Sequence, residues 1–121
     1  VEIKGGSRIV GLRIDPMECN CVIKHFHVYD LVNDREELAV KSMNGIVNRS
    51  RIIFGSNDPL LEIEVPQNDG VIRIEVVFEI EYFDNSLITD TYHMLSGERK
   101  YVDRLKENYE QEINIRIHVR L

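Results

Sequence analysis

The sequence lacks most of the features by which common functional classes are recognised. It contains no Trp, three Pro and only two Cys in 121 residues. Two cysteines are too few for the disulfide framework of a small secreted scaffold, and no apolar run approaches the ~20 residues needed to span a bilayer. The formal net charge is −6. An acidic chain of this kind disfavours nucleic acid and anionic membranes as main partners, and we expect neither nucleic-acid binding nor membrane insertion.

The chain does contain enough apolar material for one folded domain. Hydrophobic residues make up 43% and charged residues 30%, a balance that excludes disorder. No internal repeat or Pro/Ser-rich linker divides the sequence, so we expect a single domain over residues 1–121. The sequence begins at Val1 with no leader-like segment, and we expect it to be a piece of a longer protein.

The strongest pattern is a two-residue alternation from Val71 to Phe83. Six of its apolar residues share one parity: Ile72, Ile74, Val76, Phe78, Ile80 and Tyr82. Charged residues take the other parity, with Val77 as the exception. Such alternation predicts a strand with one buried and one solvated face, which is typical of antiparallel sheets. Five further segments are strand candidates: residues 10–14, 19–30, 51–54, 60–65 and 113–121. The turn residues Asn68-Asp69-Gly70 separate 60–65 from 71–83, and they predict that these two strands form a hairpin.

One segment, residues 97–112, breaks the β pattern. It is rich in charged residues, and Tyr101, Leu105 and Tyr109 follow one another at steps of four, which predicts a helix with a narrow apolar stripe and Ser96 as its N-cap. Residues 86–95 fit either a helix or a strand. The expected fold is therefore mainly β: an antiparallel β-sandwich, jelly-roll or Ig-like, with one helix near the C-terminus.

Cys19, Cys21, His25 and His27 have the chemistry of metal ligands. They share one parity, so in a single regular strand all four would project from one face. Cys19 and His27 would then lie about 26 Å apart, too far to close around an ion. We therefore expect no metal site, and we expect two reduced thiols in a cytoplasmic setting.

Motifs for catalysis are scarce. The sequence contains no nucleophile elbow and no glycine-rich phosphate loop, so we expect no catalytic residue, no cofactor and no enzymatic activity of this chain itself. Its strand carboxylates alternate with apolar residues and are expected on a solvated sheet face, paired with Arg13, Arg73 or Arg116. These carboxylates are Glu62, Glu64, Glu75, Glu79 and Glu81.

A saccharide site is the binding function that the residues favour. Of the five tyrosines, Tyr82 has core parity, and Tyr101 and Tyr109 belong to the predicted helix. Tyr29 and Tyr92 are left to stack on a sugar ring, close to polar loop residues that could bind its hydroxyl groups. The candidate carbohydrate site is Tyr29, Asp30, Asn33, Asn57, Asp58 and Tyr92. The structural alternative for these residues is ordinary packing and Asx-turns.

Two short motifs resemble a known family when taken together. The first is Gly-Leu-Arg-Ile-Asp-Pro at residues 11–16, followed by the strand candidate that contains residues 21–24. The second begins at Ile53 and Phe54 and continues through Asp58-Pro59 into residues 60–63. With the long strand that follows, residues 8–83 resemble a small β-domain attached to bacterial family 2 glycosyltransferases of cell-surface polysaccharide synthesis.

The resemblance implies a non-catalytic accessory domain, a fragment of a larger glycosyltransferase. Such a domain would bind or position glycan, or pack against the catalytic domain of its parent chain. Transfer chemistry in these proteins belongs to a separate nucleotide-sugar domain with a D-x-D motif, which this sequence lacks. The matched pairs Asp15-Pro16 and Asp58-Pro59 are expected to end strands.

Two alternatives remain open. One is a structural or oligomerisation module without a ligand, in which residues 97–112 or a strand edge pair two copies as a homodimer. The other is an enzyme in its own right, which would need a pocket with two close carboxylates.

Overall fold

The computed structural model describes residues 1–97 and 115–120. Within these residues the chain forms ten strands and one helix, and it is mainly β, as predicted. The elements are β1 (Glu2–Lys4), β2 (Gly11–Asp15), β3 (Cys21–Asp30), β4 (Glu36–Glu37), β5 (Val40–Met43), β6 (Ile46–Asn48), β7 (Arg51–Phe54), β8 (Leu61–Glu64), β9 (Val71–Phe83), α1 (Ser86–Leu95) and β10 (Arg116–Arg120).

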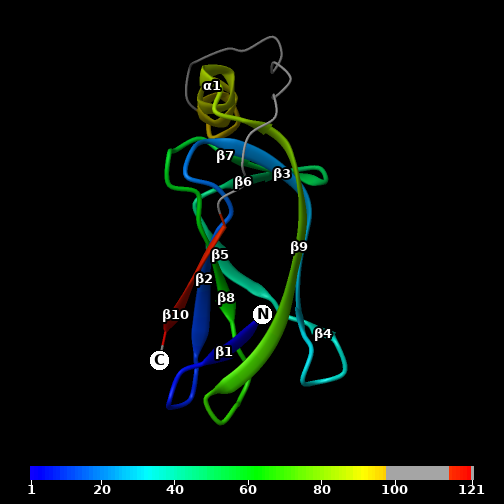
Figure 1. Ribbon diagram of the computed structural model, residues 1–121. Helices are drawn as coiled ribbons and strands as arrows, with labels where there is room; N and C mark the ends of the chain where they lie inside the picture. Colours follow the sequence, from blue (N-terminus) through cyan, green and yellow to red (C-terminus); the bar gives the residue numbers. More distant parts are fainter. Residues whose placement is uncertain (98–114, 121) are drawn as a thin grey trace.

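The strands form two antiparallel sheets (Figure 1). The first sheet has the order β1-β9-β3-β7-β6, with β4 beside β3, and the second has the order β10-β2-β8-β5. Apolar side chains of both sheets belong to one core, in which Ile23 and Phe54 of the first sheet pack with Ile14 and Leu61 of the second. The predicted sandwich of two antiparallel sheets is thus the arrangement found, because the alternating apolar faces need each other to leave water.

The predicted hairpin between residues 60–65 and 71–83 is wrong. Strand β8 pairs with β2 and β5 in the second sheet, whereas β9 pairs with β1 and β3 in the first. The turn carries the chain from one sheet to the other, and the side chain of Asn68 holds it there. Its side-chain oxygen accepts a hydrogen bond from Ile9 N at 3.0 Å, and its side-chain nitrogen donates one to Ile9 O at 2.6 Å. These two hydrogen bonds fix the turn to the distant residue Ile9.

Residues 86–95, which fitted either a helix or a strand, form helix α1. Asn85 caps it by accepting a hydrogen bond from Leu87 N at 2.9 Å. Within the helix, the side chain of Ile88 is fully buried. Ser96, expected as the N-cap of a following helix, is instead the C-cap of α1. The helix predicted over 97–112 lies outside the described residues, apart from Gly97. Nowhere in the described ranges is there a helix with the length and hydrophobicity to cross a membrane.

Strands β3 and β9 pair along most of their length, but two β-bulges interrupt the pairing. In β9, Val22 faces Tyr82 and Ile23 faces Ile80, so Glu81 is an additional residue. A bulge reverses the alternation of side chains beyond it. The parity of Tyr82 predicted that it lies in the shared core, and this prediction is wrong. Tyr82 instead packs with Val22 on the other face of the sheet, beneath α1.

Candidate functional site

The structure separates the six residues of the predicted carbohydrate site into two groups. Tyr29, Asp30 and Asn33 lie at the end of β3 near β4, whereas Asn57, Asp58 and Tyr92 lie at the other end, near α1 (Figure 1). Tyr29 lies eight positions along β3 from Cys21, which pairs with Phe54. This corresponds to roughly 26 Å in an extended strand. These residues therefore do not form one site.

In the first group, the polar atoms serve the turn. The buried Asp30 carboxylate accepts hydrogen bonds from Val32 N at 3.0 Å and Asn33 Nδ2 at 2.7 Å, which is an Asx-turn. The Tyr29 ring is covered by the guanidinium group of Arg35, 4.5 Å from the ring centroid. Arg35 is itself hydrogen-bonded to Glu75 at 2.6 Å, so a sugar could stack on that ring face only by displacing a paired cation.

In the second group, Tyr92 packs against the small core under α1 that contains Val22 and Ile88. Asn57 and Asp58 are exposed in the loop between β7 and β8. The backbone carbonyl of Asp58 accepts a hydrogen bond from Asn44 Nδ2 at 2.8 Å. This hydrogen bond fixes the loop to the turn between β5 and β6. The contacts of this group therefore stabilise the loop and attach α1 to the first sheet.

The four residues with metal-ligand chemistry are also separated, although a regular strand would have placed them on one face. Between Lys24 and His27, strand β3 carries one additional residue relative to β9, and His25 adopts φ 56°. The bulge reverses the parity, so Cys21 lies in the core, whereas His27 binds Glu37 on the surface. The part of the chain that the structure describes holds no group of three or more His, Cys, Asp or Glu side chains placed to bind a metal.

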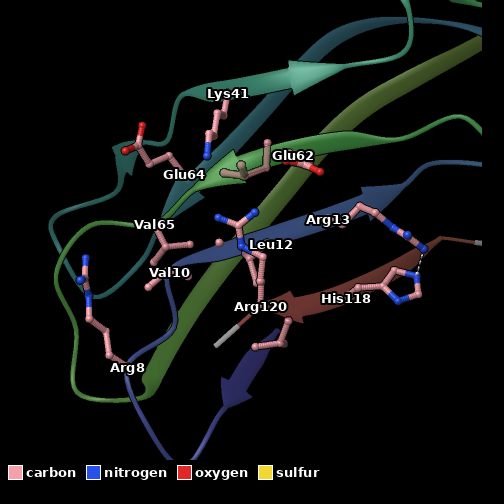
Figure 2. Close-up of a pocket in the computed structure, with 13 residues that line it drawn as sticks. Arg8, Val10, Leu12, Arg13, Lys41, Glu62, Glu64, Val65, His118 and Arg120 are labelled. Atoms are coloured by element: carbon pink, nitrogen blue, oxygen red, sulfur yellow. Dashed lines mark hydrogen bonds between the residues drawn. The ribbon is translucent and has the colours of Figure 1, made fainter.

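A pocket that sequence reasoning missed lies on the second sheet, with a volume of about 520 Å³ (Figure 2). Leu12 and Ile63 point into the shared core, so the residues that alternate with them face the opposite side of the sheet. Most of the polar lining comes from these alternating positions. The charged and titratable lining residues are Arg8, Arg13, Lys41, Glu62, Glu64, His118 and Arg120.

Two rows of paired positions run across the pocket. In one row, His118 of β10 pairs with Arg13 of β2, which pairs with Glu62 of β8. In the other row, Gly11 takes the central position between Arg120 and Glu64. Because Gly11 has no side chain, this row leaves the middle of the sheet open.

Asp15 fixes the first row in place. Its side chain is buried, and it accepts hydrogen bonds from Arg13 Nε and Nη2, both at 3.1 Å. His118 Nε2 lies 3.1 Å from the same carboxylate and 2.9 Å from Arg13 Nη2. The guanidinium of Arg13 and the carboxylate of Asp15 thus form a bidentate ion pair. Together with the contact to His118, this ion pair holds the Arg13 and His118 side chains at the pocket.

The remaining cations of the pocket have no such partners. Among the residues described, the side chains of Arg8, Lys41 and Arg120 form no hydrogen bond or ion pair, and neither do the carboxylates of Glu62 and Glu64. Within residues 1–97 and 115–120, the pocket therefore contains three cations and two carboxylates that have no partner and can contact a ligand.

The outer face of the first sheet shows the opposite arrangement, because its charges satisfy one another. Arg51 Nε donates to Glu81 at 2.7 Å, and this hydrogen bond holds the pKa of the Glu81 carboxyl below its ordinary value. Lys24 lies 3.5 Å from the same carboxylate. The cross-strand pairing of acids expected from the sequence is thus present here, although with Lys24, Arg35 and Arg51 as the cations. The expected Arg13 and Arg116 pair instead with Asp15 and Glu18.

The signal for the pocket was present in the alternation. Arg13, His118 and Arg120 occupy the polar parity of two strand candidates, but only the pairing of β2 with β10 brings them together.

No family model matches this chain, and comparison with curated proteins and with solved structures gives no match. The fold and the pocket define a mainly β domain of two antiparallel sheets with a charged pocket on one of them.

Proposed function

We propose that this chain is a non-catalytic accessory β-domain of a bacterial glycosyltransferase of cell-surface polysaccharide synthesis, and that it binds or positions glycan. The observation that carries the proposal is the pocket on the second sheet, in which Arg8, Lys41, Arg120, Glu62 and Glu64 have no side-chain partner among the described residues, whereas Arg13 is held by Asp15. Its volume of about 520 Å³ falls within the range of small-molecule sites, about 300–1,000 Å³.

The chemistry of the lining suits a polyhydroxylated ligand. Glu62 and Glu64 can accept hydrogen bonds from hydroxyl groups, and Arg13, Lys41 and Arg120 can donate to hydroxyl oxygens. The glycan would be held through these polar contacts rather than by stacking, since none of the described residues that line the pocket is a Phe or Tyr. In the parent protein, the domain would present the glycan to a separate catalytic domain, its expected partner.

The proposal is tested by titrating the folded chain with cell-surface oligosaccharides and measuring binding by calorimetry. We expect Glu62→Gln to weaken binding at least five-fold. Glu79→Gln, an equivalent change on the exposed face of the other sheet, should leave the affinity unchanged. Absence of binding to every oligosaccharide, or an equal effect of both substitutions, would remove the glycan-binding function.

The second candidate is an oligomerisation module, favoured by the position of β10 at the edge of its sheet. An edge strand offers unpaired backbone groups to another chain, and Val119 in this strand is 40% exposed. Two copies could then join along β10. Light scattering at high protein concentration tests this, and a monomeric mass would exclude it.

A further inference from the structure

Two long cationic side chains reach into the pocket from opposite edges of the second sheet. Lys41 comes from β5 and Arg120 from β10, with β2 and β8 between them. The two edge strands are separated by three strand spacings, roughly 14 Å, and the close-up shows both side chains directed over the two central strands (Figure 2). The sheet thus brings two cations together above its middle.

Local irregularities favour both orientations. Val40 faces Ile63 and Ser42 faces Glu62, so Lys41 is the additional residue of a bulge in β5, and a bulge re-aims the side chain that it carries. Arg120 pairs with Gly11, and its Nε lies 3.9 Å from the place where a Cβ at position 11 would stand. Arg120 thus lies across β2 directly over Gly11, in space that a side chain larger than a methyl group at position 11 would enter.

Cations gathered in one pocket repel each other unless an anion lies between them. On the first sheet the chain supplies such anions itself, since Arg35 and Arg51 are each bound to a glutamate. In the pocket Glu64 lies in the same row as Arg120, yet within the described residues no ion pair joins them. The arrangement leaves the two cations available to a negative group from outside.

We propose that the ligand of this pocket is an anionic saccharide, one whose ring carries a carboxylate or a phosphate group. The anionic group lies between Arg120 and Lys41, where a guanidinium can bind either oxyanion with two hydrogen bonds. Ring hydroxyls donate to Glu62 and Glu64. This inference rests on the proposed function, because it names the class of glycan that the same pocket takes.

The two glutamates decide against a bare anion as the ligand. A free phosphate or carboxylate would be repelled by Glu62 and Glu64, whereas hydroxyl groups give these carboxylates the hydrogen-bond donors that they need. A ligand that satisfies the whole lining therefore combines one negative group with several hydroxyls.

The test compares four probes on the folded chain by calorimetry: a glucuronate-containing oligosaccharide, a phosphorylated sugar, the neutral oligosaccharide of matching length, and inorganic phosphate. We expect one of the two acidic sugars to bind at least ten-fold more tightly than the neutral one, and that sugar shows whether the anionic group is carboxylate or phosphate. The preference should fall with added salt, because it is electrostatic.

Arg120→Gln and Lys41→Gln should each remove most of the preference for the acidic sugar. Arg73→Gln is the matched control, because Arg73 is exposed on β9 of the other sheet, and it should change nothing. Equal binding of the neutral and acidic sugars would overturn this inference and leave the proposed function standing. Inorganic phosphate binding as tightly as the sugar would overturn the saccharide part, and absence of binding by all four probes would overturn both proposals.

Discussion

The ring of Tyr92 occupies the place where a side chain at position 55 would stand. A Cβ built on Gly55 would lie 2.5 Å from Cγ of Tyr92 and 2.6 Å from its Cβ, closer than non-bonded carbon atoms approach. The hydroxyl of Thr89, on the same helix, donates to Gly55 O at 2.7 Å. Helix α1 is thus fitted onto the first sheet at this glycine, and the fit explains why Tyr92 is a packing residue.

Gly55→Ala should lower the free energy of unfolding by about 1–3 kcal/mol, because the added methyl group overpacks the contact between β7 and α1. Urea unfolding followed by circular dichroism measures the change. In a Tyr92→Ala background the same substitution should cost much less, since the ring is gone. An equal cost in both backgrounds would show that the clash with Tyr92 is not its source.

Asp15→Asn should destabilise the attachment of β10 to β2. The carboxylate accepts two hydrogen bonds from Arg13, and an amide cannot accept both. We expect the free energy of unfolding to fall by about 1–3 kcal/mol, with faster hydrogen exchange at the amides of β10. Asp34→Asn is the control, because Asp34 is exposed with φ 54°, a conformation that Asn tolerates. An unchanged exchange rate in β10 would contradict the role given to Asp15.

The ion pair of Glu81 with Arg51 should make stability depend on pH at the acidic end. The hydrogen bond from Arg51 lowers the pKa of Glu81 from its ordinary value of 4.5 in the folded chain. Its contribution is therefore present above that pH and is lost as the pH falls through the lower folded pKa.

The measurement is urea unfolding of the native chain and of Glu81→Gln between pH 7 and pH 3. The difference in stability between the two should be largest at neutral pH and should disappear in acid. Arg51→Gln should give the same pH profile, because it removes the hydrogen bond from the other side. A difference that persists unchanged at pH 3 would exclude this explanation.

The two cysteines should differ in reactivity although they are two residues apart. Burial raises the pKa of the Cys21 thiol strongly, and it also raises that of Cys19, which is only partly buried. Because the thiolate is the reactive form, we expect Cys21 to react with a thiol reagent at least ten-fold more slowly than Cys19.

Labelling kinetics of Cys19→Ser and Cys21→Ser separate the two thiols. The first variant should react slowly until urea unfolds it, whereas the second should keep the fast phase of the native chain. A fast phase retained by Cys19→Ser would show that Cys21 is accessible in the folded protein.

The sequence predicted the longer strands, because alternation of apolar and polar residues is a local property, but it did not predict the short strands β1, β4, β5 and β6. The runs that became β2 and β9 follow the two-residue period of a half-buried sheet, and so the class of fold could be predicted. Residues 86–95 were ambiguous because Thr89 and Thr91 favour strands. In α1 both hydroxyls find acceptors, Gly55 O and Leu87 O.

Pairing partners and bulges were not predictable in the same way. The turn at Asn68 has the residues of a hairpin, but its amide binds the distant backbone of Ile9. The bulge near His25 shifts the core positions of β3 from odd (Ile23) to even (Phe26 and Val28). Because Val22 is apolar as well, the sequence shows apolar residues on both parities and does not reveal where the shift occurs. The pocket depends on pairing between Arg13 and His118, which are far apart in the sequence, so no local pattern reveals it.

Bulges at His25, Lys41 and Glu81 show how this fold could acquire different surfaces. Inserting or deleting one residue in a strand turns over all the side chains that follow, so the core keeps its contacts only where the apolar residues change parity as well, as they do between Ile23 and Phe26. A new surface on such a sheet therefore needs one insertion together with substitutions that restore the buried face beyond it.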